Sequence, residues 1–170
     1  MSIIDFSIHS ARFVWIRYNA VNVINPELVT ESNTFRVHPN FNANTGANNI
    51  GLVSVNRFVE STDTIAPVAL SRDAEVPEST ILCIWGEDDD GEDVPGEQLQ
   101  CNEVNVYEEE EEGIVAHGNI AASRFDLGTP LVSDGVQIAY MVAPTAGNYI
   151  SGKYIRPDVD WINSITGLDL

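Results

Sequence analysis

The stretch Phe13-Val14-Trp15-Ile16-Arg17-Tyr18 shows the pattern that decides the fold class of this 170-residue chain. It is rich in β-branched and aromatic residues, which fit the pleated surface of a β-strand. Four later runs share this composition, at residues 50–55, 81–85, 104–107 and 137–142. Turn-forming residues separate them, at residues 40–46, 88–96 and 144–148. Many short strands separated by turns predict an all-β fold, either a barrel or a sandwich.

The last part of the chain differs, because its apolar residues follow a helical spacing. Val159, Ile162 and Ile165 are three residues apart. Pro157 precedes them and Gly167 follows them, and these residue types are typical of the start and the end of a helix. We therefore expect one C-terminal helix after the strands.

The charge balance excludes two classes of partner. The chain holds 26 acidic and 8 basic residues, which give a formal net charge of -18. Such a surface repels nucleic acid and anionic membranes, and it favours cationic partners or simply solubility. No apolar stretch is long enough to span a bilayer. Residues 1–5 do not look like a signal peptide, so we expect a secreted form to be a mature or truncated product.

The acidic residues gather in two clusters, at residues 87–93 and 108–112. A predicted strand of about ten residues between the clusters would separate them by about 30 Å. Two solvated loops are the simpler interpretation. The alternative is a weak Ca²⁺ site in which Asp88, Asp90 and Glu92 supply oxygen ligands, although their spacing does not match an EF-hand loop.

The histidines and tryptophans suggest structural roles. His9, His38 and His117 have no metal-ligand spacing, so we expect no metal site from them. We interpret His38 as structural and His117 as a loop residue. The three tryptophans are expected to fill the core rather than line a binding platform: Trp15, Trp85 and Trp161. No cofactor is expected, because the chain lacks a glycine-rich phosphate loop.

A second stretch bears on function: Arg124-Phe125-Asp126-Leu127-Gly128-Thr129-Pro130-Leu131-Val132. It resembles Gly-Asp-Ser-Gly-Gly-Pro-Leu-Val, the nucleophile loop of the trypsin-like serine proteases. In this alignment Leu127 takes the place of the attacking serine. A leucine side chain has no nucleophilic atom, so it forms no acyl-enzyme.

The resemblance to this family extends over residues 9–168, in the same order along the chain. Its further segments are His38-Pro39-Asn40-Phe41-Asn42, residues 48–53, residues 65–70, Trp85-Gly86, Leu99-Gln100, residues 152–156 and Asp160-Trp161-Ile162. They are most similar to arthropod gut or haemolymph members. The family implies a chymotrypsin-like double β-barrel with a short C-terminal helix. Residues 1–70 would form a truncated first barrel and residues 71–170 the second barrel with the helix.

The resemblance also implies that the catalytic triad is degraded. Asn49 occupies the position of the aspartate that orients the catalytic histidine, and its amide carries no charge. His9 is the candidate for that histidine, and an exposed histidine near the chain end is the alternative. With Leu127 at the nucleophile position, one triad member is doubtful and two are replaced.

The residues around Leu127 imply a vestigial pocket. Asp126 matches the aspartate that pairs with a new N-terminal ammonium in active members, so here it must find another partner or face solvent. The family's oxyanion hole uses backbone N–H groups of this loop. Gly128 is kept and Thr129 replaces the last glycine. Ala121 stands where trypsins carry the acid of the specificity pocket, so a residual pocket would be uncharged.

Two cysteines, Cys83 and Cys101, lie on strands that an intervening turn would fold into a hairpin. A disulfide between them would contribute roughly 3 kcal/mol to stability. Two free buried thiols are the alternative, and both possibilities stay open.

From the sequence we expect a non-catalytic serine protease homologue that is secreted and acts through binding. The missing first strands would leave open sheet edges, so a protein partner or self-association is expected. The alternatives are an acidic structural or storage protein of a secretion, or a hydrolase that uses a different set of residues.

Overall fold

The computed structural model describes residues 12–170 except 46, 72, 88–93, 110–112 and 145–149. The first half of the chain holds the strands β1 (Val14–Tyr18), β2 (Leu28–Ser32), β3 (Phe35–Val37) and β4 (Gly51–Val53). The second half holds β5 (Ala69–Leu70), β6 (Ser79–Ile84), β7 (Gln100–Glu109), β8 (Gly113–Gly118), β9 (Pro130–Ser133), β10 (Val136–Ala143) and β11 (Ile150–Ile155). A 3₁₀ helix, η1 (Arg124–Asp126), precedes β9, and α1 (Val159–Thr166) follows β11.

The second half folds into one seven-stranded sheet. Its strand order is β5-β10-β11-β8-β7-β6, and β9 also pairs with β10. The sheet curves so that β9 approaches β6, where Thr80 Oγ1 donates a hydrogen bond of 2.6 Å to the carbonyl of Val132. Strand β10 reads as a nearly continuous apolar run because it is buried on both faces.

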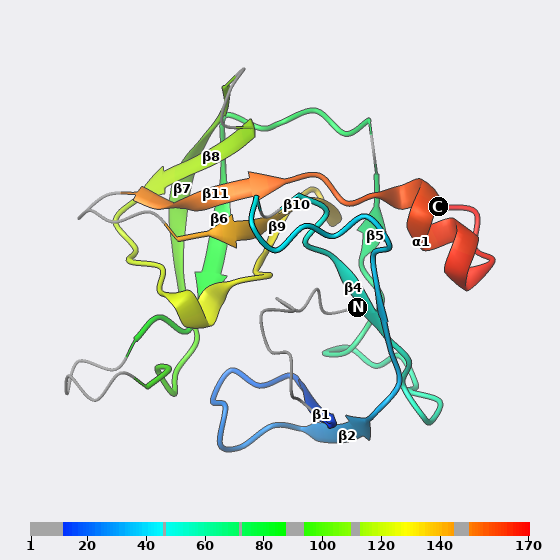
Figure 1. Ribbon diagram of the computed structural model, residues 1–170. Coiled ribbons are helices and arrows are strands. Elements are labelled where there is room, and N and C mark those ends of the chain that lie inside the picture. The colour runs from blue at the N-terminus through cyan, green and yellow to red at the C-terminus, as the bar shows by residue number, and fades with distance from the viewer. Residues whose placement is uncertain (1–11, 46, 72, 88–93, 110–112, 145–149) are drawn as a thin grey trace.

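The first half is much less regular. Strand β1 pairs with β2, and β3 pairs with β4, as two separate antiparallel ladders. Residues 54–68 form no strand that would join the ladders. The expected truncated first barrel is therefore present only as two ladders in the described part of the chain. In Figure 1 the β1–β2 ladder lies at the edge of the molecule, apart from β6, β7 and β8.

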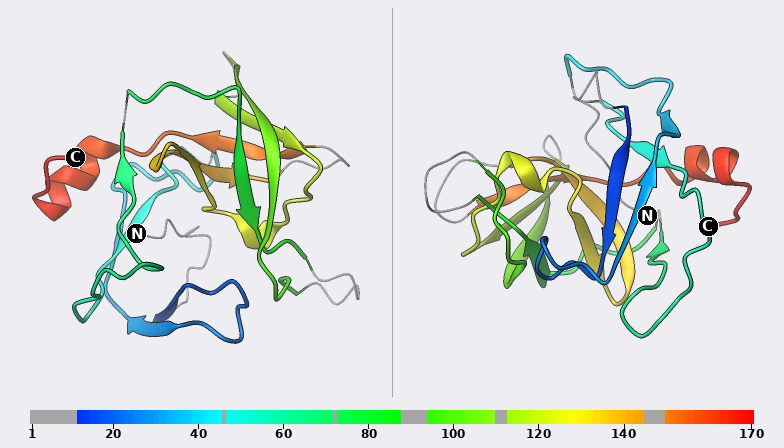
Figure 2. Two further views of the ribbon diagram at one scale, coloured as in Figure 1. Left: turned by 180° about the vertical axis from the view of Figure 1, so that it is seen from behind. Right: turned by 90° about the horizontal axis from the view of Figure 1, so that it is seen from below.

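Two hydrophobic clusters form the core. The larger lies within the curved sheet, and its buried members include Leu82, Val104, Leu131, Ile138 and Tyr154. The smaller joins the two halves of the chain, because Ile50 and Leu52 of the first half meet Tyr140 of β10 and Trp161 and Ile162 of α1. Figure 2 shows α1 at the opposite end of the molecule from β6 and β7.

The C-terminal helix was predicted correctly. Asp158 is its N-cap, with Oδ1 accepting a hydrogen bond from Trp161 N. Gly167 ends the helix in the left-handed region at φ 72°, a conformation that favours glycine. Trp161 lies in the core as expected, and the smaller cluster brings it together with Tyr140 of β10 and with Ile50 and Leu52 of the first half.

The five predicted strands are all present, as β1, β4, β6, β7 and β10. Two residue predictions were wrong. Trp15 is 59% exposed, because it lies on the outer face of the isolated β1–β2 ladder, where no second layer of the described chain covers it. His117 lies in strand β8 and not in a loop, and its ring packs against Tyr107 of the neighbouring strand.

Candidate functional site

The loop that resembles a nucleophile loop begins with a hydrogen-bonded ring between Ser123 and Asp126. Ser123 is the N-cap of η1, and its Oγ accepts a hydrogen bond of 3.1 Å from Phe125 N. Asp126 Oδ2 accepts hydrogen bonds in return from Ser123 N at 2.8 Å and from Ser123 Oγ at 3.1 Å. This reciprocal arrangement is a capping box, so the turn is stabilised by its own side chains.

The other carboxylate oxygen of Asp126 reaches across to the residues after β6. Asp126 Oδ1 accepts hydrogen bonds from Trp85 N at 3.0 Å and Gly86 N at 3.1 Å. The residue is only 2% exposed. A buried carboxylate is costly unless hydrogen bonds replace its water, and four donors do so here. Of the two alternatives expected for Asp126, a new partner or exposure to solvent, the structure has the first, and the partners are backbone amides and one hydroxyl.

Three backbone amides of the same loop are bonded within the protein. Phe125 N donates to Ser123 Oγ, Gly128 N donates to the carbonyl of Met141 at 2.9 Å, and Thr129 N donates to the carbonyl of Asp126 at 3.0 Å. An oxyanion hole requires N–H groups that point at an open position where negative charge develops. These three N–H groups point at protein oxygens instead.

Leu127 follows η1 directly and is half-buried. Asn49 is half-buried just before β4, and its side-chain oxygen is buried. His9 lies outside the described residues. Two of the three predicted triad positions are thus described, and neither side chain is a nucleophile or a carboxylate.

His38 has a structural environment. It is buried, and its Nδ1 accepts a hydrogen bond from Asn40 N at 3.2 Å. That bond leaves the proton on Nε2, which lies 3.2 Å from Asp158 Oδ2. The imidazole also packs edge-on against Trp161, with ring centroids 4.9 Å apart. Both ring nitrogens therefore have partners, and the contacts of Nε2 and of the ring join the first half to the start of α1.

The remaining predicted site residues are placed as follows. Gly128 is half-buried, Thr129 is buried and Ala121 is exposed, so the vestigial pocket stays a prediction. The Ca²⁺ candidates Asp88, Asp90 and Glu92 lie outside the described residues. Within the described ranges, no three His, Cys, Asp or Glu side chains gather as metal ligands. The search for a membrane-spanning helix in those ranges also finds none of sufficient length and hydropathy.

Cys83 and Cys101 form the disulfide that the sequence left open. They are directly opposite each other in the β6–β7 ladder, with Cα atoms 4.1 Å apart. Disulfides are typical of proteins in oxidising compartments, so this domain is consistent with extracellular proteins.

Burial raises the pKa of two tyrosines well above the ordinary value. Desolvation is the main cause for both Tyr140 and Tyr154. The negative charge of Asp158 adds to the effect at Tyr140, and that of Asp126 adds to it at Tyr154. Both phenols therefore stay protonated at neutral pH. At the surface, hydrogen bonds from Thr64 and Asn19 lower the pKa of Glu27.

Ser123 is the site residue that sequence reasoning missed. It supplies the capping contact that occupies the amide of Phe125. The signal was available, because Ser123 and Asp126 have the Ser-x-x-Asp spacing of a capping box. The segment that resembles the protease loop begins only at Arg124 and so does not include Ser123.

Comparison with known proteins agrees with the fold. A family model described as Trypsin matches residues 9–148. The chain is also similar to a solved structure described as "Structure of GrC", with a TM-score of 0.72 and 19% identity over 94% of this chain and 85% of that one. At this identity the likeness shows the fold alone, which is chymotrypsin-like. No curated protein matches the chain. Because the family model covers most of its residues, this chain belongs to the trypsin family.

Proposed function

We propose that this trypsin-family chain is a non-catalytic homologue that acts by binding. The observation that carries the proposal is Leu127, an apolar residue at the nucleophile position of a loop in which the amides of Phe125 and Gly128 donate to protein oxygens. Acyl transfer needs both a nucleophile and free donors for the oxyanion. Asn49 at the aspartate position supports the same conclusion, since an amide does not stabilise an imidazolium as a carboxylate does.

The test is labelling with a fluorophosphonate probe, together with turnover of peptide and ester substrates, with an active trypsin in parallel. We expect neither labelling nor turnover by this protein. The matched variant is Leu127→Ser, which restores the hydroxyl and leaves the loop hydrogen bonds in place. It should stay inactive, because Phe125 N still donates to Ser123 Oγ and Asn49 still replaces the aspartate. The proposal would be overturned if the unmodified protein turned over a substrate and a serine protease inhibitor abolished that turnover.

The second candidate is an acidic structural or storage protein of a secretion. The formal net charge of -18 favours it, because such a charge keeps a protein soluble and separate at high concentration. Native mass spectrometry of material from its source separates the two candidates. A partner bound at fixed stoichiometry favours the binding protein, and an abundant free protein favours the storage protein. Both candidates place the chain outside the cell, in keeping with its disulfide.

A further inference from the structure

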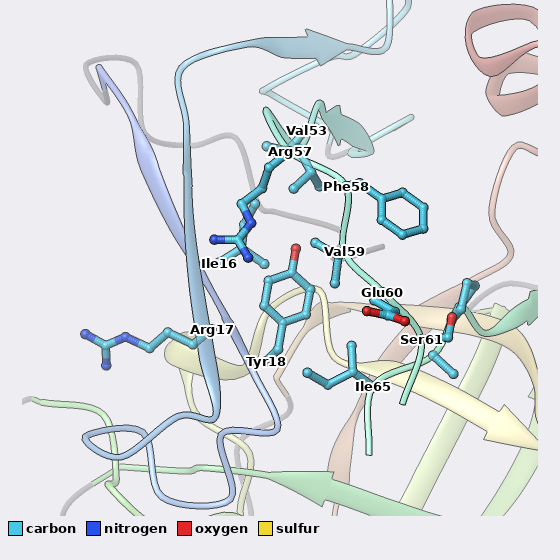
Figure 3. Close-up of a pocket in the computed structure, with 13 residues that line it drawn as sticks. Ile16, Arg17, Tyr18, Val53, Arg57, Phe58, Val59, Glu60, Ser61 and Ile65 are labelled. Carbon is cyan, nitrogen blue, oxygen red and sulfur yellow. The ribbon is translucent and has the colours of Figure 1, made fainter. Parts of the chain in front are cut away.

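An apolar groove of about 460 Å³ lies between β1 and the chain that follows β4. Ile16 and Tyr18 reach into it from β1, and Val53, Val59 and Ile65 line the other side. Figure 3 shows that Ile16 and Tyr18 point into the groove while Arg17 points away from it. The first half of the chain also holds much of the exposed apolar surface. Eight of the fourteen large apolar side chains that are exposed in the described ranges lie between residues 13 and 58: Phe13, Trp15, Val21, Ile24, Val29, Val37, Val55 and Phe58.

Strand β1 borders this groove and has an open edge. Within the described residues it pairs only with β2, so the backbone groups on its other side form no ladder with a strand. An edge of this kind is a template for another strand. The side chains of β1 alternate in burial, with Val14, Ile16 and Tyr18 half-buried and Trp15 and Arg17 exposed. The strand therefore has one apolar face toward the groove and one outer face with an aromatic ring and a cation.

The charge is divided very unevenly between the two halves of the chain. Residues 1–70 hold five acidic and four basic residues, whereas residues 71–170 hold 21 acidic and four basic residues. Two copies that met through their second halves would repel each other strongly. Residues 1–70 are nearly neutral, so two copies that meet through these residues do not repel each other in this way. Such a contact also keeps the two acidic second halves apart. A cationic protein would instead be drawn to residues 71–170.

We propose that two copies of this chain pair through β1, antiparallel, about a two-fold axis at Ile16. This symmetry places Ile16 opposite Ile16 of the second copy, Val14 opposite Tyr18, and Trp15 opposite Arg17. The two ladders then become one four-stranded sheet in which the edges of both β1 strands are satisfied. The inference deepens the proposed binding role by naming the occupant of the open edge.

The register of this pairing is self-complementary. Residues directly opposite in an antiparallel pair lie on the same face, so each exposed Trp15 ring meets a guanidinium from the other copy. Trp15 Nε1 already donates to Glu31 Oε2 at 2.9 Å, which places a carboxylate beside the arriving cation. Arg17 uses one N–H on the carbonyl of Val23 and keeps its other donors and its planar faces. No like charges face each other across the axis. The apolar side chains of the two β1 strands lie on the same face of the combined sheet.

Cysteine cross-linking tests the register. Ile16→Cys puts a thiol on the proposed axis, where a residue faces its own copy with Cβ atoms about 5 Å apart. We expect mild oxidation to convert this variant into a covalent dimer. The matched control is Val29→Cys, on the exposed face of the neighbouring strand β2. In the four-stranded sheet the two copies of residue 29 are three strand spacings apart, roughly 14 Å, so this variant should stay uncrosslinked. Circular dichroism checks that both variants are folded.

Sedimentation of the unmodified protein at physiological salt is the second measurement, and we expect a dimer. Arg17→Glu should weaken the association at least about tenfold, because it removes two cation–aromatic contacts and brings carboxylates next to Glu31. A folded monomer at tens of micromolar protein would overturn the proposal. Hydrogen exchange would then show whether residues 1–11 of the same chain protect the amides of β1, and that outcome would overturn it too. Equal cross-linking at residues 16 and 29 would overturn it as well. These variants leave the loop around Leu127 untouched, so the peptidase assay reads out independently of the association.

Discussion

Asp158 and His38 are 120 residues apart in the sequence, yet Asp158 Oδ2 lies 3.2 Å from His38 Nε2. The other carboxylate oxygen of Asp158 caps α1 by accepting a hydrogen bond from Trp161 N at 2.9 Å. One side chain therefore begins the last helix and also anchors it to the first half of the chain. The first half has few strands of its own, so this contact is one of the points where it is attached to the rest of the protein.

Removing the carboxylate of Asp158 is expected to lower the free energy of unfolding. Asp158→Ala loses the helix cap and the bond to His38, at a cost of about 2 to 3 kcal/mol in total. Asp158→Asn keeps a capping oxygen and should cost less than about half of that. Denaturant unfolding measures both variants, with the exposed Asp169→Ala as the control, expected within about 0.5 kcal/mol of the parent. Equal losses for Ala and Asn would show that the cap contributes little.

Trp161→Ala should be among the most destabilising substitutions in the chain. The ring is 9% exposed and belongs to the cluster that joins Ile50 and Leu52 to Tyr140. Truncating a buried aromatic side chain leaves a cavity, so we expect a loss of about 3 to 5 kcal/mol. Ile165→Ala is the matched control, because Ile165 lies on the same helix and is 46% exposed. A loss below about 1 kcal/mol for Trp161→Ala would contradict its place in the core.

Asp126→Ala tests the hydrogen-bonded ring of the 123–129 loop. The variant leaves the amides of Trp85, Gly86 and Ser123 without their acceptor in a buried position. We expect a loss on the order of 3 kcal/mol or more in thermal or chemical unfolding. The exposed Asp73→Ala removes the same charge at the surface and should have little effect. If both variants unfold alike, the charge matters and the buried acceptor does not.

Tyr154→Phe is expected to stabilise the protein. The Tyr154 hydroxyl is buried and has no hydrogen-bond partner among the described residues. Removing an unsatisfied buried polar group should raise the free energy of unfolding by about 1 to 2 kcal/mol. The exposed Tyr107→Phe is the control, and it should change the stability by less than about 0.5 kcal/mol. A loss of stability in Tyr154→Phe would show that the hydroxyl has a partner in solution.

The same tyrosine gives the protein a defined alkaline limit. Burial holds the pKa of Tyr154 above its ordinary value, so the folded state keeps its proton at a pH where the unfolded chain has lost it. Stability is therefore complete below about pH 10 and is lost as the pH rises above that value. Absorbance of tyrosinate should show Tyr154 titrating only together with unfolding. In Tyr154→Phe, the part of the tyrosinate absorbance change that accompanies unfolding should be smaller.

Much of the fold was visible in the sequence because strands and the helix have local signals. The β-branched runs marked five strands, and Pro157 and Gly167 marked the ends of α1. Strand β9 was missed although Asp134-Gly135 is a strong hairpin signal. Both residues have positive φ, 49° and 78°, as a two-residue turn requires. The turn between β9 and β10 is therefore specified by its own two residues.

The exposure of Trp15 could not be predicted from local composition. An aromatic residue in an alternating strand is buried only when a second layer covers its face, and no element of the described chain covers the outer face of β1. Two partners of Asp126 could not be predicted either, because Trp85 and Gly86 are about forty residues away and contact it through backbone atoms. Any residue except proline supplies a backbone N–H donor, so the residue type does not reveal such a contact.

The four hydrogen bonds of Asp126 have a consequence for maturation. Each carboxylate oxygen already receives two donors, which fills the roughly four acceptor positions that a carboxylate offers. In active trypsin-like proteases a cut upstream frees an ammonium group that docks on this aspartate and completes the site. Here both oxygens of that aspartate are already bonded to groups of the chain itself. We therefore expect a cut upstream of this loop to leave its hydrogen bonds unchanged.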